Sequence, residues 1–350
     1  MSNPNTISAH ETPQPGQPVR PEGLSALGKM RWGVKHPPSD PTISFAGKTV
    51  LVTGANTGLG FEAALKYSAL GASKLILGVR TVEKGQATKA RILSHTGRSP
   101  DSISYLTVDL DTFSSVQSFC NALEKEVSPS GLDIALLCAG LAPPAWRASP
   151  EGWELALQVN VLSTALLAKL LLPILQKTGN KDGVPPHLTF VNSSGNDMVK
   201  KEWFDKSSGF GGSALRMVND KKGWSSFRNY TVIKLMGLVV MRDVAREAEG
   251  GEGPGVIVNA VCPGMCKTDL GRDHPWVQKV LMAGMSPFVH RTAEEGGRSL
   301  VSATALGPDS HGRFWHNDLL YPLHELVDDE EFRSKTLKEI MDIVDKVPGI

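Results

Sequence analysis

Short apolar runs alternate along this chain with longer segments of helical periodicity, and this alternation limits the fold more than any other feature. The runs are rich in β-branched residues and almost continuously apolar, as expected for strands buried on both faces. Strands that alternate with helices in this way form a parallel sheet. The expected strands are Thr49–Thr53, Lys74–Val79, Ile103–Val108, Ile134–Cys138, Leu188–Asn192, Val256–Val261 and Gly312–Trp315.

The segments between these runs space their apolar residues as amphipathic helices do. The expected helices are Gly58–Leu70, Val82–Ser94, Phe113–Glu126, Pro150–Gln176, Arg228–Glu249, Ala293–Ala303 and Asp329–Val344. Residues 45–350 are therefore predicted to form a single α/β domain. We expect a doubly wound parallel sheet of about seven strands with helices on both faces.

The N-terminal part of the chain, residues 1–44, differs in composition from the rest. Eight of the 23 prolines fall between Pro4 and Pro41, mixed with Ser, Thr, Gln and Gly. Such a segment buries too little apolar surface to offset the entropy of ordering it. We therefore expect a mostly disordered tail, with at most a short turn around Leu24–Trp32 docked on the domain.

Charge and cysteine content exclude several classes of partner and site. With 37 Lys+Arg against 36 Asp+Glu the formal net charge is +1, which gives no electrostatic footprint for nucleic acid or an anionic membrane. Four cysteines are too few for a disulfide scaffold and suit a reducing compartment. No Cys/His pair completes a zinc set with Cys262 and Cys266, so we expect buried thiols and no metal site.

The most apolar stretch, Leu155–Leu175, contains Gln158, Asn160, Ser163 and Lys169. These polar residues favour a buried amphipathic helix over a membrane span. The N-terminus lacks the basic start and apolar stretch of a secretory signal. We therefore expect a soluble, cytoplasmic protein without a transmembrane segment.

A glycine-rich turn joins the first expected strand directly to a helix. Its glycines allow a tight turn and a close approach of the backbone to a pyrophosphate, while the helix N-terminus offers N–H groups to an anion. A turn that binds no ligand is the alternative. A P-loop is excluded, because Gly47-Lys48-Thr49 precedes the strand. The residues predicted to contact a dinucleotide here are Gly54, Asn56, Thr57, Gly58, Leu59 and Gly60.

The end of the second strand bears on the choice of cofactor. An acidic residue there would bind the ribose hydroxyls of NAD, whereas a basic residue accommodates the 2′-phosphate of NADP. The position is occupied by Val79 and Arg80, with no acid before Glu83. We therefore predict NADP(H) over NAD(H), with Arg80 as an ordinary surface charge as the alternative. Asp109 and Leu110, just past the third strand, are placed to meet the adenine.

Tyr230 and Lys234 lie four residues apart on an expected helix, so both side chains share one face. A free tyrosine has a pKa of about 10, and a nearby ammonium lowers it toward the range useful in acid–base catalysis. Ser194 follows a strand end, where ligands bind in open sheets, and Asn160 is a polar residue inside the apolar helix. Ser194 as a turn residue and Asn160 as a satisfied core amide are the alternatives.

Together these motifs resemble the short-chain dehydrogenase/reductase family in its single-domain branch, which has a Rossmann fold. The resemblance covers roughly residues 45–320. It rests on Thr53–Gly60, Asp109, Ala139-Gly140, Asn160, Ser194, Tyr230, Lys234, and Pro263-Gly264 followed by Thr268. Asn56, Arg80 and Arg291–Gly296 are similar to retinol-dehydrogenase-like members and to NADPH-dependent reductases of fungal secondary metabolism.

The resemblance implies a role for each of these residues. Tyr230 would exchange the proton with the substrate oxygen, and Ser194 would hydrogen-bond that oxygen in preference to Ser193. Lys234 would hold the nicotinamide ribose and lower the pKa of Tyr230, and Asn160 would anchor a water for proton relay. The positions expected to contact the cofactor beyond the glycine turn are Asp109, Leu110, Ala139, Gly140, Asn160, Tyr230, Lys234, Pro263, Gly264 and Thr268.

Two departures from the family pattern stand out. Leu137-Cys138 replaces a pair of asparagines that the family commonly has before Ala139-Gly140, which puts cofactor affinity or local order in doubt. The connection between Ser194 and Tyr230 is also longer than usual, with an insertion at about 197–227. It carries Trp203, Phe204, Phe210, Met217, Trp224 and Phe227.

These aromatics predict either a lid over an apolar ligand or side chains that simply pack the insertion down. The family's substrate loop would lie at about 265–290, which adds Trp276, Val280, Leu281, Met282, Met285 and Phe288. We therefore expect a lipophilic ketone, aldehyde or alcohol: a polyketide-like or terpenoid-like compound, a retinoid or a steroid. By resemblance we also expect a homo-oligomer, paired through the Pro150–Gln176 and Arg228–Glu249 helices.

Other functions remain open at this stage. A cofactor-binding regulatory or scaffold protein could share this fold and use its Pro-rich tail for recognition, but it would not need Ser194, Tyr230 and Lys234 together. A nucleotide-sugar epimerase or dehydratase shares the Tyr and Lys, yet this chain has no evident C-terminal sugar domain. A zinc alcohol dehydrogenase is disfavoured by the lack of a ligand cluster.

Overall fold

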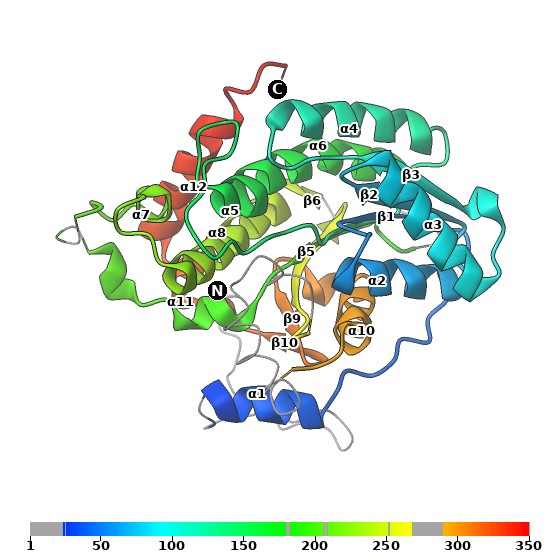
Figure 1. The fold of residues 1–350 in the computed structure, drawn as a ribbon, viewed down its shortest axis with the longest axis horizontal. Helices are drawn as coiled ribbons and strands as arrows, with labels where there is room; N and C mark the ends of the chain where they lie inside the picture. Colours follow the sequence, from blue (N-terminus) through cyan, green and yellow to red (C-terminus); the bar gives the residue numbers. More distant parts are fainter. Residues whose placement is uncertain are drawn as a thin grey trace, which may run out of the picture.

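A twisted, mostly parallel sheet forms the centre of the protein (Figure 1). The computed structural model describes residues 24, 26–179, 183–205, 207, 209–250, 253–267 and 290–349. Across the sheet the strand order is β10-β9-β8-β5-β4-β1-β2-β3. These strands are β1 (Thr49–Thr53), β2 (Lys74–Val79), β3 (Ile103–Thr107), β4 (Ile134–Leu137), β5 (His187–Val191), β8 (Ile257–Cys262), β9 (Phe314–His316) and β10 (Leu319–Tyr321).

Seven of these strands run parallel, and β10 is antiparallel to β9. We predicted about seven strands, so β10 is an addition. It follows a two-residue turn at Asn317 and Asp318, whose φ angles of 53° and 56° suit a tight hairpin. The sequence has no glycine at this turn, so the hairpin was not predicted. A separate two-stranded ribbon pairs β6 (Glu249–Gly250) with β7 (Gly253–Pro254).

Helices cover both faces of the sheet (Figure 1). On one face lie α2 (Gly58–Ala69), α3 (Val82–Thr96) and α10 (Ala293–Ala303). On the other lie α4 (Phe113–Val127), α6 (Ser163–Thr178) and α8 (Ser226–Glu247), with α12 (Glu330–Val344) outside them. The shorter elements are η1 (Pro100–Ser102), α5 (Leu155–Leu157), η2 (Gln158–Leu162), η3 (Ser194–Met198), η4 (Lys201–Phe204), α7 (Ala214–Asn219), η6 (Pro308–Ser310) and α11 (Glu325–Asp328).

Two apolar cores result, one on each side of the sheet. Every residue of β1 is buried, and successive side chains point to opposite faces. Leu51 therefore belongs to the core under α4 and α6, whereas Val50 and Val52 belong to the core under α2 and α10. This arrangement explains the continuous apolar runs seen in the sequence.

The connection order places β1 between β2 and β4. β2 and β3 extend the sheet on one side of β1, and the later strands, beginning with β4, extend it on the other side. In open sheets of this kind, ligands bind at the carboxyl ends of the strands where the direction of building reverses.

Two predicted segments differ from the structure. The expected helix Pro150–Gln176 instead begins at Leu155, where Glu154 accepts the Leu157 N–H at 2.8 Å, and it contains a π-helical segment, η2. Of the tail predicted to be disordered, residues 26–44 lie within the described part, and they include helix α1 (Ala26–Lys35). α1 overlaps the short docked turn expected around Leu24–Trp32, and its end is held by Arg291, which is distant in sequence.

The last helix also changes the expectation of a subunit interface. α12 packs on both α6 and α8 within the same chain. Lys169 of α6 forms an ion pair at 2.6 Å with Asp345, which follows α12. Part of the surface of the two helices through which we expected two subunits to pair is therefore covered by this chain's own helix.

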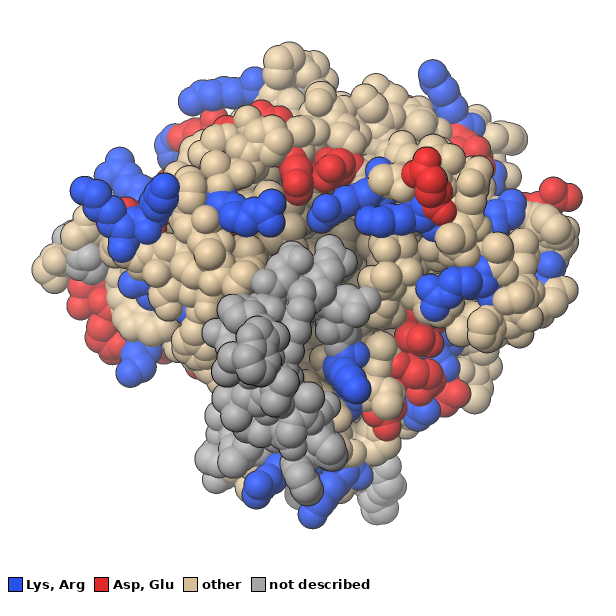
Figure 2. Space-filling model, viewed as in Figure 1, with Lys and Arg blue, Asp and Glu red and all other residues tan. Residues whose placement is uncertain are grey.

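Lys and Arg side chains are interspersed with Asp and Glu over the face seen in Figure 2. This view agrees with the near-zero net charge and shows no expanse of one sign. One helical stretch among the described residues, Leu155–Thr178, is long and apolar enough to cross a membrane, but 78% of its most apolar window is buried inside the protein. Its burial agrees with the core helix predicted from the sequence.

Candidate active site

The glycine turn after β1 packs against the loop after β4. Gly54 has a φ of +68°, and a Cβ there would lie 2.8 Å from the Ala139 Cα. A Cβ on Gly60 would collide with the Gly54 carbonyl. Because neither position has room for a side chain, the turn is held tight at the reversal point of the sheet.

The N-terminus of α2 opens from this turn. Thr57 is its N-cap residue, and within the described chain its side chain accepts no hydrogen bond from the first-turn N–H groups. By contrast, Thr81 caps α3 by accepting the Lys84 N–H at 3.3 Å. The α2 N-terminus is therefore a suitable place for an anion, and the dinucleotide predicted from the glycine turn fits it.

The loop after β4 is tied down without the asparagines that the family commonly has. The Thr53 hydroxyl accepts the Cys138 and Ala139 N–H groups at 3.1 and 3.2 Å. Asn160 bonds both the N–H and the carbonyl of Leu141, at 3.0 and 2.7 Å. These bonds order the loop although Leu137-Cys138 stands in place of the usual asparagines. The π-helical segment η2 positions Asn160, and the two bonds to Leu141 use its amide oxygen and its amide nitrogen.

Tyr230 and Lys234 share one face of α8, as predicted. The Lys234 ammonium lies 5.8 Å from the centre of the Tyr230 ring and donates to the Val191 carbonyl at 3.3 Å. Burial raises the pKa of Tyr230, and a hydrogen bond with Ser193 opposes this. Burial also lowers the pKa of Lys234. The expected lowering of the Tyr230 pKa by Lys234 therefore differs from the structure, where burial dominates.

A small cavity lies behind these residues, bordered by Asn160, Thr164, Asn192 and Lys234. Its volume is about 20 Å³. A water molecule needs about 10–15 Å³ and two or more polar partners, and both conditions are met. The cavity therefore suits the water that Asn160 was expected to anchor.

The two serines after β5 face different neighbours. The Ser193 side chain lies beside Tyr230, and Gly195 leaves room for both, since a Cβ there would lie 3.3 Å from the Ser193 Oγ and 3.6 Å from the ring. The Ser194 N–H donates to the Cys262 sulfur at 3.3 Å, and its Oγ is 3.7 Å from that sulfur. The structure thus places Ser193 beside Tyr230, and the role predicted for Ser194 stays a prediction.

The other predicted cofactor contacts are spread along the carboxyl edge. Arg80 is exposed after β2. Asp109 accepts the Asp111 N–H at 3.1 Å, and the Leu110 carbonyl accepts the Ser163 hydroxyl at 2.7 Å. Both groups therefore also hold the loop itself. Thr268 and most of the expected substrate loop, residues 268–289, lie outside the described residues.

Comparison with known proteins agrees with this geometry. Residues 48–184 match the family model described as short chain dehydrogenase. The chain is 44% identical over 325 residues to the short-chain dehydrogenase/reductase ffsI of Aspergillus flavipes, covering 92% of this chain and 93% of that protein. It is 42% identical to the short-chain dehydrogenase/reductase phmF of Phaeosphaeria nodorum, covering 92% and 94%.

The chain belongs to the short-chain dehydrogenase/reductase family. It is therefore an oxidoreductase of a family that uses NAD(P)(H). Solved structures share the fold: the RhlG/NADP complex of Pseudomonas aeruginosa has a TM-score of 0.59 at 22% identity, covering 79% of this chain and 97% of that one. The L-sorbose reductase of Gluconobacter frateurii has a TM-score of 0.57 at 17% identity, with the same coverage.

This short-chain dehydrogenase/reductase also contains a pair formed by the buried Cys262 and the half-buried His316, which the sequence analysis missed. Cys262 ends β8 and is in register with His316 at the end of β9. Burial alone would raise the pKa of Cys262, but the charge and hydrogen bond of His316 and the N–H groups of Ser194 and Gly264 lower it to about 6. The sequence did not point to this pair, because Cys262 and His316 come together only when β8 pairs with β9.

We expect Cys262 to titrate near pH 6, whereas burial raises the pKa of Cys120, Cys138 and Cys266 to about 12. Its folded pKa lies below that of an unfolded thiol, so its contribution to stability is complete above the unfolded pKa and is lost as pH falls through about 6. Thiolate absorbance against pH should show one step in the wild type and none in Cys262→Ser. A step that persists in this variant contradicts the assignment.

The insertion packs against the rest of the protein, which distinguishes between the two interpretations of its aromatic residues, a lid over a ligand or a packed segment. Phe204 contacts Phe332 of α12 with ring centres 4.8 Å apart, and the Ser213 hydroxyl donates to Glu339 at 2.8 Å. Trp203 and Phe210 also pack against the core. Phe227 differs, because it is 57% exposed. The described residues of the insertion therefore do not form the aromatic lid that was considered, apart from this side chain.

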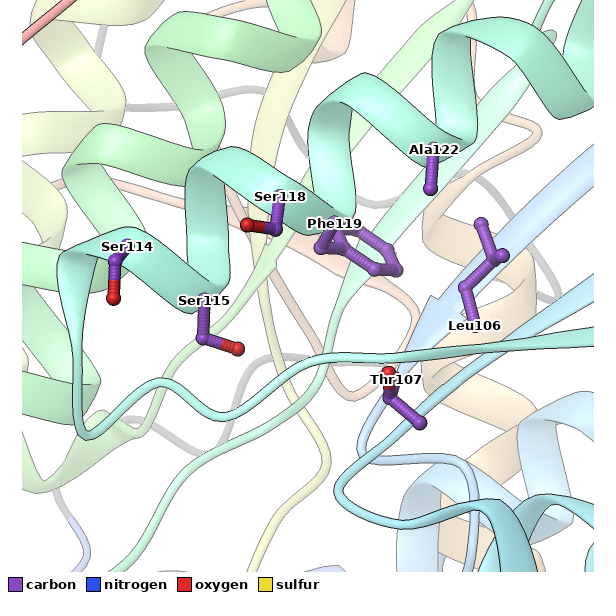
Figure 3. A pocket seen from close by; sticks show the side chains of 7 residues that line it. All are labelled: Leu106, Thr107, Ser114, Ser115, Ser118, Phe119 and Ala122. Atoms are coloured by element: carbon purple, nitrogen blue, oxygen red, sulfur yellow. The ribbon is translucent and has the colours of Figure 1, made fainter.

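A larger cavity, of about 320 Å³, lies elsewhere (Figure 3). The side chains that line it come from β3 and α4 and include Thr107, Ser114 and Ser118. None of its lining residues belongs to the predicted site. Among the described residues no cluster of His, Cys, Asp and Glu could hold a metal ion.

Proposed function

We propose that this enzyme is an NADP(H)-dependent carbonyl reductase that converts a lipophilic ketone or aldehyde to an alcohol in fungal secondary metabolism. One observation carries the proposal: Tyr230 lies beside the Ser193 hydroxyl at the carboxyl end of β5, with the Lys234 ammonium 5.8 Å from the centre of its ring. Its relatives from fungi, at 44% and 42% identity over most of the chain, support the metabolic setting.

In this proposal Tyr230 is the general acid. A raised pKa keeps the phenol protonated at neutral pH, so its O–H is available to the carbonyl oxygen as negative charge develops there. The Ser193 hydroxyl donates a second hydrogen bond to that oxygen, a role that the family resemblance gave to Ser194. Bound NADPH would supply the hydride. In the reverse direction Tyr230 would take the proton from an alcohol.

Lys234 and Asn160 support Tyr230 from behind. The Lys234 ammonium lies 5.8 Å from the centre of the tyrosine ring, and Lys234 also lines the cavity of about 20 Å³. A water there would connect Lys234 to Asn160 and return a proton to the phenolate after each turnover. Lys234 would also hold the nicotinamide ribose through its ammonium, a contact that its partial exposure allows.

The residues that would hold the cofactor fit a dinucleotide. Gly54 and Gly60 keep side chains out of the turn, and the α2 N-terminus is left for the pyrophosphate. Arg80, exposed at the end of β2, would bind the 2′-phosphate. NADP in the solved structures from Shigella flexneri and Pseudomonas aeruginosa, which share the fold, is consistent with this choice.

An apolar substrate is supported by Phe227. This side chain is 57% exposed and lies three residues before Tyr230 on α8, so it shares the rim above the reacting group. A large exposed aromatic beside a proton donor suits a hydrophobic ketone better than a sugar or a polar acid. Polyketide-like and terpenoid-like carbonyls fit, as does a retinoid or a steroid.

The function is tested by NADPH consumption with apolar and polar ketones, together with fluorescence titration of NADPH and NADH. We expect turnover of apolar ketones and preference for NADPH. Arg80→Ala should weaken NADPH binding by about 10- to 100-fold and leave NADH binding unchanged, because a charged hydrogen bond contributes about 1.5–3 kcal/mol.

Lys125→Ala, an exposed cation on α4, is the control for that titration and should change neither affinity. Equal loss of NADPH and NADH affinity in Arg80→Ala would contradict the role of Arg80. Binding of neither cofactor by the wild type would overturn the proposed function.

A further inference from the structure

A buried arginine joins three parts of this chain that are far apart in sequence. Arg291 precedes α10 and is only 3% exposed. Its guanidinium donates to the carbonyls of Gly33 at 2.8 Å, His36 at 3.0 Å and Pro263 at 3.3 Å, and to the Asn317 side chain at 2.7 Å. All four acceptors are neutral. Burying a cation without hydrogen-bond partners costs free energy. The four acceptors therefore stabilise the buried guanidinium, and the guanidinium in turn holds the segments that carry them.

Glycines stand on both sides of this guanidinium. A Cβ on Gly33 would lie 3.3 Å from one terminal nitrogen of Arg291, and a Cβ on Gly264 would lie 2.8 Å from the other. Gly264 also has a φ of +80°, which disfavours any other residue. The planar guanidinium is therefore held between the end of α1 and the Pro263–Gly264 turn. Only a side chain of this shape fits the space between them.

The backbone of Arg291 supports the same turn region. Its N–H donates to the Met265 carbonyl at 2.7 Å, and its carbonyl accepts the Lys267 N–H at 2.9 Å. The turn itself continues to the active site, because the Gly264 N–H donates to the Cys262 sulfur at 3.3 Å and that sulfur also accepts the Ser194 N–H. A displacement of Arg291 would therefore move the carboxyl edge of β8.

Residues 33–40, which we call the N-terminal strap, have further ties to the body. Arg298 of α10 donates to the Pro38 carbonyl at 3.3 Å, and the Ser39 N–H donates to Asp318 at 2.8 Å. Lys66 of α2 pairs with Asp40. Figure 1 shows α1, which leads into the strap, beside β10 and the lower end of α10. The strap thus runs along the elements that surround the cofactor edge.

We propose that Arg291 is a positioning residue for dinucleotide binding, which fixes the Pro263–Gly264 turn while it is itself held by the N-terminal strap. The strap is then a component of the cofactor site, although it touches none of the glycine turn. This inference rests on the proposed NADP(H) site, and it assigns a binding role to a part of the chain that its composition marked as a tail.

The test measures NADPH dissociation constants by fluorescence on the full chain, for Arg291→Lys, Arg291→Gln and Gly33→Val. Lysine keeps the charge but cannot reach four acceptors, and valine at position 33 crowds the guanidinium from the strap side. We expect NADPH binding to weaken by about tenfold or more in Arg291→Gln and Gly33→Val, and by less in Arg291→Lys. At saturating NADPH, kcat should stay close to that of the wild type, so the effect appears in KM for NADPH.

Arg298→Gln is the matched control. It removes a partly buried contact to the strap and another cation but leaves every bond of Arg291 in place, so NADPH binding should stay unchanged. Thermal denaturation of each variant separates folding from binding. Variants of Arg291 and Gly33 that lose thermal stability yet bind NADPH as the wild type does would overturn this inference alone. A wild type that binds no dinucleotide would overturn it together with the proposed function.

Discussion

Tyr230→Phe is expected to lower kcat for carbonyl reduction by about 10²- to 10⁴-fold, the usual contribution of a positioned general acid. The ring and its contacts remain, so NADPH binding and thermal stability should stay near those of the wild type. Steady-state kinetics at saturating NADPH and ketone measure this effect. Tyr105→Phe makes the same chemical change on β3, outside the site, and should leave kcat unchanged.

The pH dependence of the wild type provides a second readout of the same residue. Burial raises the pKa of Tyr230, so the phenol stays protonated through neutral pH. Reduction should therefore be constant across neutral pH and decline only in the alkaline range, as the proton donor is lost. A Tyr230→Phe enzyme with kcat within about twofold of the wild type would remove Tyr230 from the chemistry.

Ser193→Ala is expected to cost more activity than Ser194→Ala, and this comparison decides which serine orients the substrate. Loss of one hydrogen-bond donor to a developing oxyanion typically lowers kcat by about 10²- to 10³-fold. Ser193 lies beside Tyr230, whereas the Ser194 hydroxyl lies 3.7 Å from the Cys262 sulfur. We therefore expect a loss of that size for Ser193→Ala and about tenfold or less for Ser194→Ala.

The two serines are adjacent and chemically identical, so each variant serves as the control for the other. Kinetics with one apolar ketone at saturating NADPH are sufficient. The reverse order of effects would restore the assignment that the family resemblance suggested.

The Tyr230–Lys234 balance shows how burial changes a sequence-based expectation. A lysine one helical turn away lowers a tyrosine pKa when both groups stay solvated. Here both are largely removed from water, and the Cys262 sulfur adds a charge of the wrong sign for a phenolate. The tyrosine is therefore set up as a proton donor, which agrees with reduction as the proposed direction.

The sequence by itself determined the elements that depend on local physics. β1 and β2 begin and end at the predicted residues, and so does α10, because apolar periodicity and flanking turn residues are properties of neighbours in the chain. The glycine turn and the shared face of Tyr230 and Lys234 belong to the same class, since a fixed spacing on one turn or one helix places them. The prediction that Arg80 binds the 2′-phosphate rests on the same kind of local counting, along a single βαβ unit.

Only the tertiary structure decided the features that depend on residues far apart in sequence. The pairing of β8 with β9 brings His316 to Cys262, the start of η3 places Ser193 beside Tyr230, and α12 packs on α6 and α8. We expected the strap to be part of a mostly disordered tail, because its partners, among them the buried Arg291, are distant in sequence and local composition does not reveal them. Local composition reports the entropy of ordering a segment, whereas the contacts that offset this entropy form only when the chain has folded.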